Sequence, residues 1–441
     1  MRTPLVTAPG LDTPRTGSRA AVSWPRVGRI ILRVSALASL LTGMVIFVLG
    51  RLQGRFDGQF EDFRAYYDAG AALNAGHDPY AVFVHQTPNV ALTGFDYPPV
   101  IAWLCRPLAL LPFHVAATLW LWLAIVTTLA ATVIVARCLL PATWPRVEIA
   151  LLATFAYAPA LYNFWHGQMN PVVFLLLALA LRAYVSGHET ECGAWLGMGA
   201  AVKLAPAVLV ILLLRRHWWR GTLVAMVTGA ATLLAGVVVV GFGAFETWVR
   251  DVLPVLTRGN GWLYNQSWSG VVHRVADHGV LNVAPDLVGL RLASTLLSVA
   301  GVVAVVWAVD RRATRPEVRG AEFGAGLVAM LLAGTITWYA HYVDLVVPLV
   351  AALALLRLPF ERGRRSLVAA AVAALVVTGI VARLLINYAD MPGIVRASHT
   401  AYWWPLIQLC SAPALSAGLL LAALVVVLRA LHPDRPARPL P

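Results

Sequence analysis

Long apolar runs separated by short polar segments dominate the chain. The first run covers about residues 30–50, and the others lie near 98–112, 115–137, 147–164, 169–186, 194–214, 221–243, 288–309, 323–340, 342–358, 366–388 and 404–429. Runs of roughly 18 or more apolar residues are typical of membrane-spanning helices. The pattern predicts an all-α polytopic membrane protein with about 12 transmembrane helices.

The polar segments divide the chain into one membrane domain and two tails. Residues 1–27 are rich in Pro, Arg, Thr and Ser without a hydrophobic period, which is typical of a disordered tail. A single transmembrane domain is predicted over 28–430, with 51–97 as its first extracytoplasmic loop and 431–441 as a cytoplasmic tail. The first apolar run has no small-residue cleavage site, so we expect it to be a membrane helix.

Composition supports this class and sets the orientation. The chain is 59% hydrophobic and 12% charged, with a mean hydropathy of +0.73. Its net charge of +13 comes from arginines at the ends of apolar runs, which indicates the positive-inside rule and anionic lipid rather than nucleic acid. The basic segments expected in the cytoplasm are 2–29, 215–220, 310–320, 357–365 and 429–438. Arg137 and Arg146 are exceptions, because twelve spans place them outside.

Two further counts are informative. The four cysteines are scattered, with no spacing typical of a metal site or a disulfide framework. Of the 34 basic residues only Lys203 is a lysine, and it lies within a predicted span. This pattern fits a chemical need for a compact ammonium group at that position.

The longest polar interruption, 55–99, contains the first candidate for catalysis. Its segment FEDFRAYYDAGAAL predicts a short amphipathic helix on which Asp62 and Tyr66 are four residues apart. A carboxylate held beside aromatic side chains at the membrane interface could take a proton from a sugar hydroxyl. The alternative is a solvated acidic loop that merely keeps this segment outside.

Two polar sites interrupt the following apolar runs. The stretch NFWHGQMN carries Asn163, His166, Gln168 and Asn170, which at membrane depth need a cavity or partners. It could instead be an interhelical turn. Lys203, followed by Pro206, could balance the charge of a departing phosphate. It could also pair with an acid or extend to the surface.

Two later stretches offer groups that bind sugars and phosphates. In YNQSWSGVVHR, Asn265, Gln266 and Ser267 provide amides and a hydroxyl, and Arg274 provides charge, although its tryptophans also suit simple interface anchoring. In TWYAHYVDLVVP, His341 could orient an acceptor hydroxyl, or it could form a packing pair with the residue three positions later.

Seven pieces of the sequence, in order, resemble glycosyltransferase family 87, the polyprenyl-phosphate-mannose-dependent mannosyltransferases. They are DFRAYYDAGAAL, HDPY, FDYPP, HGQMN, AAVKLAP followed by RRHWW, YNQSWSG and TWYAHYV. The resemblance implies a GT-C fold in the bacterial plasma membrane, with the active site on the extracytoplasmic (periplasmic) side. It implies transfer of mannose from polyprenyl-phosphate-mannose to a glycolipid or lipoglycan acceptor of the phosphatidylinositol mannoside type, with inversion and an α-1,2 linkage.

The resemblance also assigns roles to residues. The family's catalytic Asp matches Asp62, and its later active-site histidine matches His341. The expected substrate-binding residues are Tyr66, Tyr67, Asp96, Tyr97, His166, Gln168, Asn170, Lys203, Asn265, Gln266, Ser267, Arg274 and Trp338. Because the leaving group is a monophosphate, we expect no cofactor and no metal.

Two other functions fit the same pattern. A transporter or flippase of a lipid-linked saccharide would also place Lys, His and amide groups within its spans. Against it, we see none of the paired repeats that transporters often show. A polyprenyl-phosphate-sugar transferase for arabinose or glucose would share the reaction but not the sugar. The acceptor, the linkage, the oligomeric state and the exact number of spans between 98 and 220, some of which are short enough to be re-entrant, remain open at this point.

Overall fold

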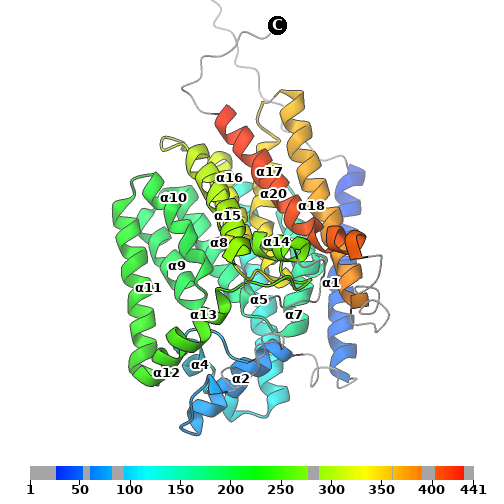
Figure 1. Ribbon diagram of the computed structural model, residues 1–441. Helices are drawn as coiled ribbons and strands as arrows, with labels where there is room; N and C mark the ends of the chain where they lie inside the picture. Colours follow the sequence, from blue (N-terminus) through cyan, green and yellow to red (C-terminus); the bar gives the residue numbers. More distant parts are fainter. Residues whose placement is uncertain are drawn as a thin grey trace, which may run out of the picture.

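The described part of the protein is a bundle of helices (Figure 1). The computed structural model describes residues 26–52, 60–81, 94–276, 288–359, 361–389 and 403–431. Within these residues no strand is present, and the nearest approach to one is an isolated bridge between Asn265 and Trp338. The predicted tails lie outside the described residues, apart from their innermost positions. The all-α class is confirmed.

The helices fall into two sets by length. The long ones are α1 (Arg26–Leu52), α5 (Phe113–Leu139), α8 (Asn170–Ser186), α11 (Trp219–Val240), α15 (Val288–Ala308), α16 (Pro316–Ala333), α18 (Arg362–Ala389) and α20 (Trp403–Ala430). The short ones are α2 (Glu61–Asn74), α4 (Pro99–Cys105), η1 (Leu108–Leu110), α6 (Arg146–Phe155), α7 (Ala158–His166), α9 (Glu189–Val202), η2 (Ala205–Leu209), α10 (Val210–Arg215), α12 (Phe242–Thr247), η3 (Trp248–Val252), α13 (Leu253–Leu256), α14 (Trp268–Ala276), η4 (Tyr339–Leu345) and α17 (Val346–Leu355).

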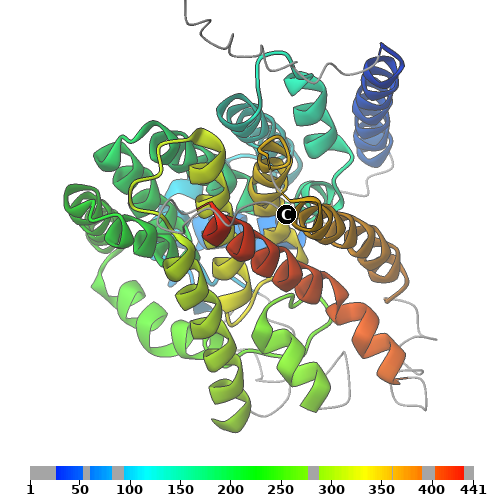
Figure 2. The same ribbon diagram turned by 90° about the horizontal axis from the view of Figure 1, so that it is seen from above.

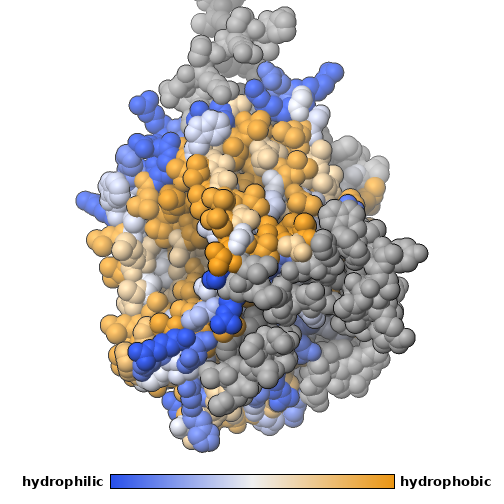
Figure 3. Space-filling model, in the orientation of Figure 1, coloured by the Kyte–Doolittle hydropathy of each residue, from blue (hydrophilic) through white to orange (hydrophobic). Residues whose placement is uncertain are grey.

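The outside of the bundle is apolar, as a membrane requires. Where Figure 3 colours this face, hydrophobic residues cover most of its middle, and polar residues collect toward its two ends. Among the residues that the structure describes, four helices could cross a membrane by length and composition, and the pair α6–α7, bent by 50°, could form a fifth span. The four single helices are Phe113–Leu139, Trp219–Val240, Val288–Ala308 and Gln408–Ala430. These apolar helices support a membrane location.

Two ends of the bundle matter for function. At one end, which we call the α2 end, α2 packs under the start of α5, where Phe63 and Phe113 are in ring contact with centroids 5.8 Å apart. At the other, which we call the Arg216 end, Arg216 meets the last turn of α8. Figure 1 shows these ends at the bottom and the top of the bundle, and Figure 2 shows α1 at its rim.

The predicted span 194–214 is wrong, because the chain turns back within it. A Cβ on Gly193 would lie 2.0 Å from the carbonyl oxygen of Gly221, and one on Gly197 would lie 2.4 Å from that of Ala225. Helices α9 and α11 are therefore parallel, and close contact between small residues holds them together. The chain returns between them through η2 and α10. Lys203, in extended backbone conformation after α9, lies at this turn.

The predicted span 98–112 is also wrong. Helix α4 and η1 stay beside α2: a Cβ on Gly70 would lie 2.8 Å from the backbone of Cys105, and the Tyr67 hydroxyl donates to the Leu111 carbonyl at 2.8 Å. Helix α5 then starts at the α2 end and finishes at the Arg216 end, where a Cβ on Gly320 would meet Leu139.

Without a span at 98–112, the predicted topology no longer places Arg146 outside, so this exception to the charge pattern disappears. Arg146 donates to the carbonyl of Leu140, just past the end of α5. The guanidinium of Arg357 lies over Trp144, 5.9 Å from the ring centroid. The segment that joins α5 to α6 therefore lies at the Arg216 end, with the other basic loops.

Candidate active site

Aromatic packing fixes the position of α2, the first predicted site helix. Phe63 is buried and stacks on Trp120, with ring centroids 5.1 Å apart. Tyr66 is also buried, and its hydroxyl donates to that of Tyr97 at 3.2 Å. The predicted amphipathic helix exists, and its aromatic face packs into the protein. Burial of several rings anchors this helix, because aromatic side chains bury large apolar areas.

A glycine turn places the next polar group against α2. Gly167 ends α7 with φ +68°, and its carbonyl accepts a hydrogen bond from the Trp120 indole at 2.8 Å. A Cβ at this position would lie 2.6 Å from the Cβ of Phe63, so only glycine allows so close an approach. The turn directs Gln168 at Asp62, whose carboxylate accepts a hydrogen bond from the Gln168 amide at 2.5 Å.

A continuous row of hydrogen bonds connects five predicted site residues, which we call the polar chain. The side-chain amide of Asn170 donates to the side-chain oxygen of Gln168 at 3.4 Å. The side-chain oxygen of Asn170 accepts from the Lys203 ammonium at 2.8 Å. The Lys203 nitrogen lies 2.6 Å from Nε2 of His341. The polar chain therefore runs from Asp62 through two amides to a cation and an imidazole. Its members come from α2, the 167–170 turn, the 203 turn and η4.

Lys203 is the centre of this arrangement. Its ammonium also lies 3.5 Å from the Tyr97 hydroxyl. An ammonium group has only donors, so Nε2 of His341 acts as the acceptor and its other ring nitrogen carries the proton. Three carboxylates, those of Asp62, Asp96 and Asp344, act electrostatically on this one cation.

Burial changes the protonation of the two loop carboxylates. Burial raises the pKa of Asp62 to about 7, and the Gln168 hydrogen bond and the Lys203 charge oppose the increase. Burial likewise raises the pKa of Asp96 to about 6, opposed by Lys203. Asp62 therefore exchanges its proton near neutral pH, which is where a general base works best.

The segment that carries Asp96 and Tyr97 is held from two sides. The Tyr80 hydroxyl donates to the Tyr97 carbonyl at 2.7 Å, and the Trp248 indole donates to the Asp96 carbonyl at 3.2 Å. The motifs HDPY and FDYPP are thus in direct contact. Their bonds hold the Tyr97 hydroxyl between Tyr66 and Lys203.

Asn163, a polar residue of the stretch NFWHGQMN, was not among the predicted site residues. Its amide donates to the carbonyl of Ala340 at 2.7 Å, and its oxygen accepts from Asn170 at 3.0 Å. Asn163 thereby joins the 167–170 turn to the start of η4. Its position in the polar stretch NFWHGQMN was the available signal.

Two predicted residues near the α2 end lie outside the polar chain. Tyr67 bonds to the carbonyl of Leu111, as described above, and packs on Phe113. His166 stacks on Tyr162 with ring centroids 4.2 Å apart. The side chains of Tyr67 and His166 therefore both contact neighbouring protein groups.

The side chains of the predicted sugar-binding stretch 265–267 instead form hydrogen bonds with other protein groups, mainly backbone carbonyls. Asn265 donates to the carbonyls of Asn260 and Thr335, at 2.9 and 3.0 Å. Gln266 donates to the carbonyl of Cys410 at 2.9 Å, and Ser267 donates to the Asn265 side chain at 2.8 Å. All three side chains are buried. Their partners are protein groups, so the structure does not bring them to the polar chain.

Arg274 and Trp338 belong to the same backbone assembly. Arg274 is fully buried and donates to Ser411 and to the carbonyls of Trp262 and Asn265. Trp338 is partly exposed and forms the isolated bridge with Asn265, three residues before His341. This assembly therefore supports the segment that leads into η4.

Comparison with known proteins identifies the family. The sequence model of glycosyltransferase family 87 matches residues 95–334, more than half of the chain. The chain belongs to glycosyltransferase family 87. It is therefore a glycosyltransferase, and the predicted resemblance is confirmed. The family favours the enzyme over the transporter.

Curated relatives of this glycosyltransferase come from mycobacteria. One from Mycolicibacterium smegmatis is 29% identical over 327 residues, 71% of this chain and 75% of the relative. One from Mycobacterium tuberculosis strain CDC 1551 is 30% identical over 302 residues, 65% of this chain and 64% of the relative. Both are named polyprenol-phosphate-mannose-dependent alpha-(1-2)-phosphatidylinositol pentamannoside mannosyltransferases. A third, from Mycobacterium tuberculosis strain H37Rv, is 28% identical over 344 residues, 74% of this chain and 77% of the relative, and is named for phosphatidylinositol mannoside.

The matched range covers part of the polar chain. Gln168, Asn170 and Lys203 lie within 95–334, whereas Asp62 and His341 lie outside it. The hydrogen bonds of the polar chain are what connect these two residues to the matched part of the glycosyltransferase.

Proposed function

We propose that this glycosyltransferase moves mannose from a polyprenyl-phosphate-mannose donor to an acceptor of the phosphatidylinositol mannoside type, with inversion and an α-1,2 linkage. The observation that carries the proposal is the polar chain, which joins a carboxyl group titrating near neutral pH to the ammonium of Lys203 through hydrogen bonds. The names of the curated relatives supply the donor and the acceptor class.

In the proposed reaction an acceptor hydroxyl attacks the anomeric carbon of the mannose. The new bond joins the acceptor oxygen to that carbon, and the bond from the carbon to the phosphate oxygen breaks. Asp62 takes the hydroxyl proton, and polyprenyl phosphate leaves with the bonding electrons. Attack opposite the phosphate converts a β-linked donor into an α-linked product. Fixed geometry and a positioned base account for the acceleration.

Lys203 is the group that we assign to the departing phosphate. A compact ammonium held by Asn170 and His341 is already oriented before the reaction. Preorganised charge of this kind stabilises a developing anion without reorganisation. His341 keeps the ammonium in place and can orient the acceptor or the sugar.

The finer features of the enzyme follow from the same proposal. We assign it a GT-C fold with the α2 end on the extracytoplasmic side of the plasma membrane, since the arginine-rich loops lie at the opposite end. Because the leaving group is a monophosphate, we propose that transfer is independent of metal. Activity that is lost in EDTA and restored by a divalent ion would contradict that point.

A transfer assay tests the proposal. Purified protein in lipid nanodiscs receives polyprenyl phosphate carrying radiolabelled mannose, together with a phosphatidylinositol mannoside acceptor. The expected product is the acceptor with one added mannose in α-1,2 linkage, identified by methylation analysis. Parallel reactions with the arabinose and glucose donors test the sugar. A labelled product from one of those donors and none from the mannose donor would overturn the proposed substrate.

A further inference from the structure

A second set of buried polar side chains lies at the Arg216 end, far from the polar chain. We call it the Arg216 cluster. It consists of Tyr184, Arg216 and Glu322, whose exposed fractions are 0%, 6% and 0%. The Arg216 guanidinium donates to the Tyr184 hydroxyl at 2.6 Å and forms an ion pair with Glu322. The Tyr184 hydroxyl donates to the same carboxylate at 3.1 Å.

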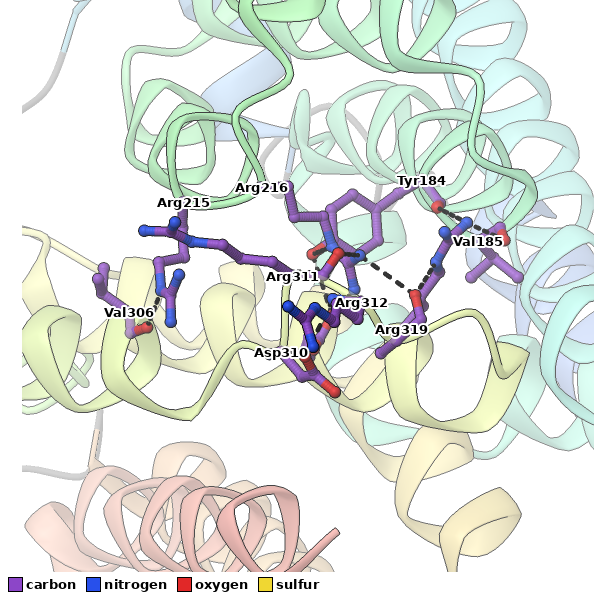
Figure 4. Close-up of polar contacts among 11 residues, drawn as sticks. Tyr184, Val185, Arg215, Arg216, Val306, Asp310, Arg311, Arg312 and Arg319 are labelled. Atoms are coloured by element: carbon purple, nitrogen blue, oxygen red, sulfur yellow. Dashed lines mark hydrogen bonds and ion pairs between the residues drawn. The ribbon is translucent and has the colours of Figure 1, made fainter. Parts of the chain in front are cut away.

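Surrounding backbone completes the cluster. The backbone N–H of Asp310 donates to the second oxygen of Glu322 at 2.8 Å. Arg216 donates to the carbonyls of Arg311 and Ala313, at 3.3 and 3.2 Å. Figure 4 shows Arg216 beside Tyr184 and the loop that starts at Asp310, and Arg319 also donates to the Ala313 carbonyl, at 2.8 Å. Glu322 therefore accepts from three donors, and each nitrogen of the guanidinium has an acceptor.

The cluster joins the three elements that carry the cationic half of the polar chain. Helix α8 begins at Asn170 and reaches Tyr184 about 21 Å along its axis. The segment from Lys203 through η2 and α10 ends at Arg216. Helix α16 contains Glu322 and is followed, after residues 334–338, by η4 with His341.

Helices are stiff rods in a densely packed bundle, so fixing one end fixes the other. The contacts of Lys203 with Asn170 and His341 are hydrogen bonds, which weaken after displacements of a few tenths of an ångström. The short, broken segment 203–216 has no long helix of its own to hold it. Leu209, Leu212 and Leu213 of this segment are fully buried, and Arg216 fixes its far end to Tyr184 and Glu322.

We propose that the Arg216 cluster is a positioning device that holds Lys203 in register with Asn170 and His341. The catalytic consequence rests on the proposed function, because that function gives Lys203 its role. Tyr184, Arg216 and Glu322 touch no substrate in this account. They act through the elements that end at the active site.

An isosteric substitution, Glu322→Gln, tests the proposal. The native carboxylate accepts from three donors, and an amide would direct its own N–H groups at some of them. The double variant Arg216→Met/Glu322→Leu is a second test that keeps the site filled, since apolar replacement of both partners of a buried ion pair often preserves folding. Glu148→Gln is the matched control, because the Arg33–Glu148 pair joins α1 to α6 and touches none of the three elements.

The readout uses the fact that Lys203 is the only lysine in the chain. Protein grown with lysine labelled with ¹³C at the ε-carbon gives one side-chain NMR signal, which reports the surroundings of Lys203 without any need for activity. We expect the signal to shift or split in Glu322→Gln and in the double variant, and to coincide with the wild type in Glu148→Gln. Near-ultraviolet circular dichroism establishes that each variant is folded.

Activity gives an independent second readout. We expect kcat for mannosyl transfer to fall about 10- to 100-fold in the two cluster variants, as displacement of a catalytic group does, with KM within about threefold. An unchanged lysine signal in a folded cluster variant overturns the proposal, whatever the activity. A shifted signal in a protein whose wild type transfers no mannose supports the positioning role and refutes the proposed function.

Discussion

The two ends of the bundle use the same residue types in opposite ways. At the Arg216 end, Arg216 and Glu322 meet directly, and the tyrosine and loop backbone satisfy their remaining groups. At the α2 end, two amides separate the Asp62 carboxylate from the Lys203 ammonium. The ion pair of Arg216 and Glu322 has all its hydrogen-bonding groups occupied by protein, so it leaves no charge for a ligand. A separated pair leaves a base and a cation that can each act on a substrate.

The difference also appears in charge balance. Asp62, Asp96 and Asp344 all act on the single ammonium of Lys203. One oxygen of Asp344 is buried without a hydrogen-bond partner among the described residues. Near the polar chain, this buried carboxylate oxygen is therefore not satisfied by protein contacts, as is often found at functional sites. Predictions that separate the two ends follow, from the largest effect to the smallest.

The largest effect is expected for Asp62→Asn, which keeps the shape of the side chain but cannot accept a proton. We expect kcat to fall about 10²- to 10⁴-fold, the range for loss of a general base. Asp68→Asn is the matched control, because Asp68 is on the same helix and exposed. The measurement is initial transfer rate with saturating donor. Equal losses in both variants would mean that α2 contributes only bulk charge.

A smaller loss is expected for Lys203→Met, which removes the cation and keeps an unbranched side chain. Loss of one preorganised electrostatic contact corresponds to about a 10²- to 10³-fold decrease in kcat. The exposed Arg258 provides a control, Arg258→Met, which we expect to transfer mannose at the wild-type rate. Retention of more than half of the wild-type kcat in Lys203→Met would rule out the assigned role at the phosphate.

Gly167→Ala should weaken the contact between α2 and the 167–170 turn. The new methyl would overlap Phe60 and Phe63, and the left-handed backbone adds about 1–2 kcal/mol. Gly76→Ala is the control, since Gly76 has φ +75° and open space around it. We expect a lower unfolding temperature than in the control, with kcat reduced about 10-fold as Gln168 shifts. Identical behaviour of the two variants would show that the overlap has no consequence.

Four of the five residues of the polar chain could be predicted because they stand out against apolar surroundings, whereas Asp62 lies in the polar segment 55–99 and was predicted from the amphipathic helix and the family resemblance. Lys203 and the stretch NFWHGQMN are conspicuous within long hydrophobic runs. The turn at Lys203 was missed because a chain that reverses inside the bundle has the same hydropathy as one that crosses. The prediction of a span at 98–112 was wrong for a related reason, because burial against α2 selects the same apolar residues as contact with lipid does.

The Arg216 cluster was hidden for another reason. The positive-inside rule explains any arginine in a loop, so Arg216 looked like its exposed neighbours. Glu322 comes just before the apolar run 323–340 and had no partner in view along the sequence. Only the packing of α8, α10 and α16 shows that the two residues meet. Similarly, Asn265 and Gln266 resemble sugar ligands in type, and only their contacts show that they bind backbone.

The pH dependence of transfer tests most directly whether Asp62 is the base of the polar chain. Burial raises its pKa to about 7, so the ionised, base form increases with pH through that value. We predict that kcat/KM rises about tenfold per pH unit below pH 7 and levels off above it. Removing the Gln168 hydrogen bond, which lowers that pKa, in Gln168→Leu should move the midpoint to higher pH. A profile that is flat from pH 5.5 to 8.5, or a midpoint unmoved in Gln168→Leu, would contradict the assignment.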